Sequence, residues 1–108
     1  MKKNILLVED EPDLNQTISF NLDSEGYSVQ STFNGTDALK SIDVKLPDLI
    51  LLDLMLPDMS GLEICRILRS AKKTKNIPIM MVTAKGEEID NDHIEQMRLS
   101  ATKALLER

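Results

Sequence analysis

Apolar runs of strand length alternate along the chain with segments in which apolar residues recur at helical spacing. Most of these runs are almost wholly apolar, as in strands that are buried on both faces of a sheet, and one run of similar length, 27–31, is more polar. The helical segments repeat apolar residues at steps of three and four. The expected strands are 5–8, 27–31, 49–52 and 77–82, and the expected helices are 14–22 (ended by Gly26), 36–42 and 62–68.

This order, strand and helix in strict alternation, predicts an α/β protein with a parallel sheet covered by helices on both faces. The chain has 108 residues, which fits a single domain over 1–108. It contains no internal repeat, low-complexity stretch or linker composition. We therefore expect one compact unit whose functional groups lie at the ends of the strands.

The last part of the chain, 86–108, does not continue the alternation. Its apolar residues Ile94, Met97, Ala101 and Ala104 recur at steps of three and four, which predicts one helix, and no β-branched run follows 77–82. A fifth strand is therefore expected to be absent or altered, so that 77–82 becomes an apolar edge strand. Such an edge and an unpartnered helical stripe predict a homodimer or larger self-assembly through this strand and the tail helix.

The composition of the chain argues against several kinds of binding partner and cellular location. The net charge is −5 and only three residues are aromatic, which argues against direct nucleic-acid binding and against base-stacking platforms. The single cysteine, Cys65, cannot form an internal disulfide, which fits the cytoplasm. The apolar run after Met1 ends at Val8, too early for a signal peptide or a membrane span.

Polar groups follow three of the expected strands directly. Glu9 and Asp10 follow the first strand, Asp53 follows the third, and Thr83 follows the fourth. Taken singly, an acid after a strand is often a loop residue or a helix cap, and a threonine there is often only a strand residue. In an open α/β sheet, however, these ends meet at the crevice where ligands bind.

Three carboxylates in one crevice would repel each other and raise each other's pKa unless a cation offsets the repulsion. Mg²⁺ suits such oxygen ligands and retains waters and phosphate oxygens. An aspartate beside Mg²⁺ can act as a nucleophile toward phosphorus, because the metal neutralises charge on the transferring group. A hydroxyl such as that of Thr83 could then donate to a phosphate oxygen.

Four segments, in order and on the expected strand ends, resemble the receiver domains of two-component response regulators. Within that resemblance the chain looks most like receivers that precede DNA-binding output domains, and the similarity runs from residue 3 to about residue 88. The family implies a flavodoxin-like fold of three layers, α/β/α, with strand order 2-1-3-4 for the strands present. The segments are 6–12, 48–57, 60–61 and 82–85.

The resemblance also implies roles for individual residues. Asp53 would be the phosphoacceptor, with Asp10 as a metal ligand, Glu9 as its acidic partner and Met55 lending its backbone carbonyl to Mg²⁺. Thr83 would be the switch hydroxyl that turns toward the phosphate. The partner would be a sensor histidine kinase or a phosphotransfer protein, and the domain itself would not be an enzyme.

The chain departs from the family pattern after residue 85. The family's lysine of the fifth strand is expected near position 105, which is a leucine, so Lys85 or Lys103 is the possible surrogate cation. This gap leaves two functions open: a phosphoacceptor signalling domain, or a switch-impaired receiver that acts as an interaction or oligomerisation module. A flavodoxin-like cofactor binder is disfavoured, because no Gly-rich or Ser/Thr-rich phosphate loop follows the first strand.

Overall fold

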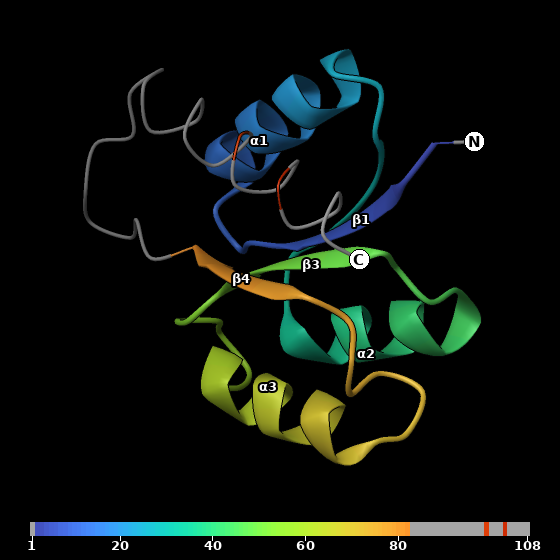
Figure 1. Cartoon of the computed structure of the whole chain (residues 1–108). Coiled ribbons are helices and arrows are strands. Elements are labelled where there is room, and N and C mark those ends of the chain that lie inside the picture. The colour runs from blue at the N-terminus through green and yellow to red at the C-terminus, as the bar shows by residue number, and fades with distance from the viewer. Residues whose placement is uncertain (1, 83–98, 100–102, 104–108) are drawn as a thin grey trace.

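The computed structural model describes residues 2–82 together with Leu99 and Lys103. Within 2–82 the chain forms four strands and three helices in strict alternation (Figure 1). The strands are β1 (Asn4–Val8), β2 (Ser28–Thr32), β3 (Leu49–Asp53) and β4 (Ile79–Val82), and the helices are α1 (Pro12–Ser24), α2 (Gly35–Val44) and α3 (Gly61–Ser70).

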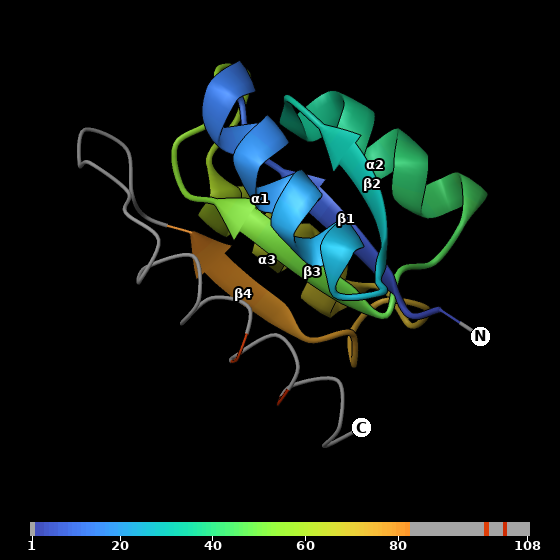
Figure 2. The ribbon, with the colours of Figure 1, turned by 90° about the horizontal axis from the view of Figure 1, so that it is seen from above.

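All strand pairs are parallel, and the order in the sheet is β2-β1-β3-β4. Helix α1 covers one face, while α2 and α3 cover the other (Figures 1 and 2). The predicted three-layer α/β/α architecture and the order 2-1-3-4 are therefore confirmed for this part of the chain. Because the chain adds β2 on one side of β1 and β3 on the other, the strand order reverses between β1 and β3.

The two central strands are apolar on both faces, as their unbroken runs predict. On β1 and β3 the odd-numbered side chains join one buried cluster on the α1 side, and the even-numbered ones join a second cluster under α2 and α3. Complete burial of these leucines, isoleucines and a valine supplies most of the favourable free energy of folding. The paired central strands are consequently a rigid base for whatever their carboxyl ends carry.

Each helix begins at a recognisable signal. Pro12 occupies the start of α1, where its missing N–H costs nothing. The Asn34 side chain accepts the Asp37 N–H at the start of α2, and the Ser60 hydroxyl accepts the Leu62 N–H at the start of α3. Gly26, with φ of 94°, makes the left-handed turn that ends the first helical segment.

The starts of β4 and β2 lie later than predicted, while β1 begins one residue earlier and β2 and β3 each end one residue later. Strand β4 begins at Ile79 rather than at residue 77, because the Ile77 N–H closes a turn onto the Thr74 carbonyl and Pro78 has no N–H to donate. Strand β2 begins one residue late, because the Tyr27 N–H bonds back to the Leu22 carbonyl of α1. Ile77 still contributes to the core as a buried side chain.

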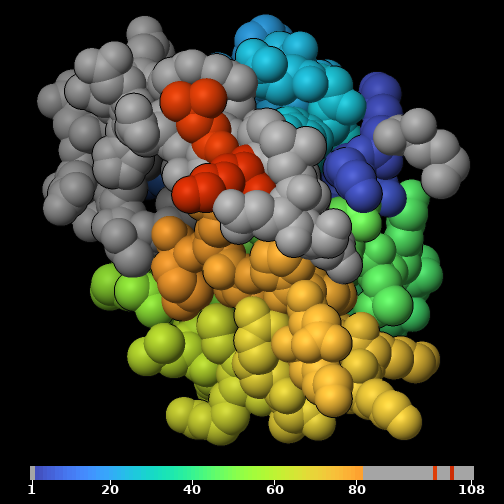
Figure 3. All heavy atoms as spheres, in the orientation of Figure 1, coloured from blue at the N-terminus to red at the C-terminus, as the bar shows by residue number. Residues whose placement is uncertain are grey.

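Several expectations fall on residues outside the described part: the fifth strand, the helix over 86–108, and the residues Thr83 and Lys85. The two described residues of the tail, Leu99 and Lys103, are helical and exposed. Among the described strands β4 is an end strand, and it lies at the surface beside α3 in the space-filling view (Figure 3). Within the described residues, no helix combines the length and hydrophobicity needed to cross a membrane.

Candidate functional site

Three carboxylates meet where β1 and β3 end. The two strands pair in register, with Val8 opposite Leu52, so the residues that follow lie side by side at one edge of the sheet. One carboxylate oxygen each from Glu9, Asp10 and Asp53 lies within 4.8 Å of the others. This convergence, at the reversal point of the strand order, is the one that the sequence pattern indicated.

The carboxylates are withdrawn from water. Glu9 and Asp53 are each 1% exposed, and Asp10 is half-buried. Burial raises the pKa of Glu9 from 4.5 to about 7, and the neighbouring charge of Asp53 and the hydrogen bond with Asp10 add to this effect. The Glu11 N–H, which donates to Glu9 Oε2 at 2.9 Å, opposes the shift only in part.

Met55 orients the carboxylate of Asp53. Its N–H donates to Asp53 Oδ1 at 3.0 Å, and Met55 also forms an isolated antiparallel bridge with Ser60. The loop closes where the Gly61 N–H donates to the Leu54 carbonyl at 2.9 Å. A Cβ atom at residue 61 would collide with the backbone of Asp53, so this tight return requires glycine.

Asn15 is a site-supporting residue that the sequence analysis did not identify. It is 2% exposed, and its Nδ2 donates to the Glu9 carbonyl at 2.9 Å and to the Thr32 carbonyl at 3.1 Å. The amide therefore joins α1 to the carboxyl ends of β1 and β2. One signal was present: Asn15 shares a helix face with Ile18 and Leu22, where a polar residue needs a buried partner.

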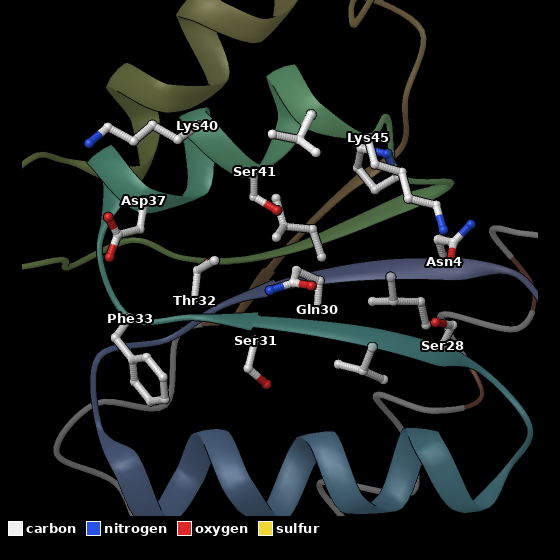
Figure 4. Close-up of a pocket in the computed structure, with 15 residues that line it drawn as sticks. Asn4, Ser28, Gln30, Ser31, Thr32, Phe33, Asp37, Lys40, Ser41 and Lys45 are labelled. Carbon is white, nitrogen blue, oxygen red and sulfur yellow. The ribbon is translucent and has the colours of Figure 1, made fainter.

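A groove of about 590 Å³ lies elsewhere, between the edge strand β2 and helix α2 (Figure 4). Its polar lining includes Gln30, Lys40, Ser41 and Lys45, and it includes none of the three clustered carboxylates. Because the titratable cluster and the strand reversal coincide at the β1–β3 edge, that edge rather than the groove is the candidate site.

The donor set fits a hard divalent cation. Three carboxylates offer oxygen ligands within one small volume. A bound cation would offset their mutual repulsion, so the electrostatic interaction favours binding. The structure thus defines a class: α/β proteins of flavodoxin-like order with an acidic cluster at the β1–β3 switch point.

Comparison with known proteins identifies the family within this class. The model of the response regulator receiver domain matches residues 5–106, and the chain belongs to this family. The match extends past residue 85, into the segment whose sequence departs most from the family pattern.

Two curated relatives are similar to the chain at 44% identity. They are the phosphate regulon transcriptional regulatory protein PhoB of Rhizobium meliloti, over 88 residues, and the alkaline phosphatase synthesis transcriptional regulatory protein PhoP of Bacillus subtilis, over 90 residues. These matches cover 82% and 83% of this chain but 39% and 37% of the relatives. The chain thus spans about two fifths of their length.

Solved structures give the same result. A response regulator of Chloroflexus aurantiacus is 27% identical, with a TM-score of 0.84 and coverage of 100% of both chains. The response regulator TrrA of Thermotoga maritima, solved in complex with Mg²⁺ and BeF, is 29% identical, with a TM-score of 0.82 over 94% of this chain and 98% of that one.

Proposed function

We propose that this receiver domain accepts a phosphoryl group on Asp53 from a sensor histidine kinase or a phosphotransfer protein. The observation that carries the proposal is the position of Asp53: a buried carboxylate at the end of β3, grouped with Glu9 and Asp10. A carboxylate oxygen of Asp53 would form the bond to phosphorus as the bond to the leaving group of the donor breaks.

Mg²⁺ would be held by Glu9, Asp10, Asp53 and the backbone carbonyl of Met55. When bound, it would neutralise charge on the transferring phosphoryl oxygens. The likeness to TrrA, which was solved with Mg²⁺ and BeF, supports this assignment. The Met55 N–H would meanwhile fix the rotation of the Asp53 carboxylate and so present it consistently to the donor.

Thr83 directly follows β4, the neighbour of β3, and would supply the switch hydroxyl that binds a phosphate oxygen. Lys85 or Lys103 would supply the cation that pairs with the phosphate in place of the family's lysine. The two curated relatives are transcriptional regulators, so we infer that the chain serves a signalling pathway in the cytoplasm.

Intact-mass spectrometry after incubation with acetyl phosphate and Mg²⁺ tests the assignment. The wild type should gain one phosphoryl group, slowly if no lysine replaces the family's cation. The gain should disappear in Asp53→Ala, in Asp10→Asn and when EDTA replaces Mg²⁺, because the nucleophile or the metal site is then lost. Phosphorylation that persists in Asp53→Ala would exclude Asp53 as the acceptor.

A second candidate function is an interaction module that has lost the switch. The observation in its favour is β4, the end strand among the residues that the structure describes, whose four residues are all apolar and carry no charge. A wild type that takes up no phosphoryl group, yet associates with itself, would favour this function over the first.

A further inference from the structure

The side chain of Asp58 hydrogen-bonds the loop between β3 and α3 (residues 54–60, the β3–α3 loop) to the start of helix α2. Asp58 Oδ1 accepts the Gly35 N–H at 2.8 Å, and its Oδ2 accepts the Thr36 N–H at 2.9 Å and the Thr36 hydroxyl at 2.7 Å. Asp58 lies 22 residues after Thr36 in the sequence, so this is a tertiary contact rather than a local turn.

Electrostatics favour the same contact. The hydroxyl of Thr36 and the N–H groups of Gly35 and Thr36 hold the pKa of Asp58 at about 2, below the usual 3.8. The first turn of a helix also attracts negative charge, because its N–H groups point outward and lack intrahelical partners. Asp58 is therefore a carboxylate at neutral pH, with both oxygens engaged.

Close packing supports the hydrogen bonds. Gly35 leaves room for the next loop residue: a Cβ atom there would lie 2.5 Å from Met59 Cγ and 2.7 Å from its Sδ. The Met59 side chain therefore packs directly against Gly35, and it would have to move if residue 35 carried a Cβ atom. Together, Asp58 and Met59 fix the outer part of the loop against α2.

The inner part of the same loop touches the candidate site. Met55, three residues before Asp58, donates its N–H to Asp53 Oδ1, and its bridge to Ser60 joins the two sides of the loop. Because the Gly61 N–H to Leu54 carbonyl bond closes the base, a shift of the outer part must be absorbed by the few residues between, including Met55.

We propose that Asp58 is a positioning residue: by fastening the β3–α3 loop to α2, it sets the backbone of Met55 relative to the carboxylate of Asp53. The geometric part of this inference concerns the Met55 N–H alone. Its consequence for Mg²⁺ rests on the proposed function, in which the Met55 carbonyl is a metal ligand.

Amide hydrogen exchange in the metal-free protein tests the geometric part. In Asp58→Ala, exchange of the Met55 N–H should accelerate about ten-fold, corresponding to the loss of roughly 1.4 kcal/mol of local protection. Thr36→Val, which removes only the hydroxyl contact, should give a smaller acceleration. Asp58→Asn retains one acceptor oxygen and should fall between them, which is the partial rescue expected of a positioning contact.

Asp48→Asn is a matched control. Asp48 Oδ2 also accepts a backbone N–H, that of Asn4 at 2.8 Å, but at the opposite end of the sheet. This variant should leave Met55 exchange unchanged. Amides of the central strands, such as those of Leu6 and Leu51, should exchange at wild-type rates in every Asp58 and Thr36 variant.

Met55 exchange that stays at the wild-type rate in Asp58→Ala would overturn the inference, and so would an equal acceleration of Met55, Leu6 and Leu51, which indicates global destabilisation. A Mg²⁺ titration separates this result from the proposed function. Mg²⁺ affinity several-fold weaker in Asp58→Ala supports both. A wild type that binds no Mg²⁺, with Met55 exchange still responding to Asp58, supports the positioning role and contradicts the metal site.

Discussion

At the scale of single residues, the protonation of Glu9 couples the acidic site to stability. Its pKa is raised in the folded state, from 4.5 to about 7, so between these values the folded protein binds more protons than the unfolded chain. The free energy of unfolding should therefore fall as pH rises from about 4.5 to about 7, and this contribution of Glu9 should level off above that range.

Glu9→Gln should remove this dependence. The amide stays neutral, so the metal-free variant should lose the part of the pH slope that lies between about 4.5 and 7, and it should be more stable than wild type at pH 8, by on the order of 1 kcal/mol. Urea unfolding at a series of pH values, with EDTA present, measures the difference. Equal slopes in the two proteins would show that Glu9 does not hold its proton in the folded state.

At the scale of elements, the return from β3 into α3 depends on Gly61. A methyl group there would collide with the Asp53 carbonyl oxygen and lie 2.9 Å from Leu54 Cα, and these backbone atoms cannot rotate away as a side chain could. Gly61→Ala should therefore lower the free energy of unfolding by about 2 kcal/mol and slow the proposed phosphorylation of Asp53.

Denaturant unfolding of Gly61→Ala beside Arg66→Ala provides the comparison, because Arg66 is an exposed residue of the same helix. Arg66→Ala should change stability by no more than about 0.5 kcal/mol. If the two variants were equally stable, the close approach of Gly61 to Asp53 would not restrict the residue type at position 61.

The elements also show what sequence could and could not reveal. The runs 5–8 and 49–52 predicted strands buried on both faces, and parallel pairing then placed Glu9, Asp10 and Asp53 together. A predicted strand boundary was wrong where one N–H group bonds outside the sheet, as the Tyr27 N–H does with the Leu22 carbonyl.

The pattern of apolar and polar residues could not predict the hydrogen bonds that surround the site. Asn15 bonds to a carbonyl 17 residues away, and Asp58 bonds to groups 22 and 23 residues away. Periodicity describes which face of an element is apolar, but it does not specify which polar groups meet across two elements. The pattern therefore gave no sign of the Asp58 contact, and for Asn15 it indicated a need for a buried partner without identifying that partner.

At the scale of the whole molecule, the position of the apolar strand β4 at the end of the described sheet predicts self-association. We expect the chain to form a homodimer or a larger self-assembly in which β4 and the tail helix are buried. Static light scattering over a concentration series should show the mass rising above that of one chain. A monomer mass that persists at high protein concentration would contradict the prediction.

The parallel pairing of β1 with β3 also has a consequence for the course of folding. The two strands are neighbours in the sheet, but α1, β2 and α2 separate them along the chain, so Glu9 and Asp53 are far apart until the central strands meet. Repulsion between Asp53 and the acids that follow β1 therefore begins only when that pairing forms. Agents that relieve it, such as protons or a divalent cation, should accelerate folding if β1 and β3 are already paired at the rate-limiting barrier, and otherwise should only slow unfolding. The effect of pH or of a divalent cation on the folding and unfolding rate constants would therefore show whether the central strands pair before or after the rate-limiting barrier.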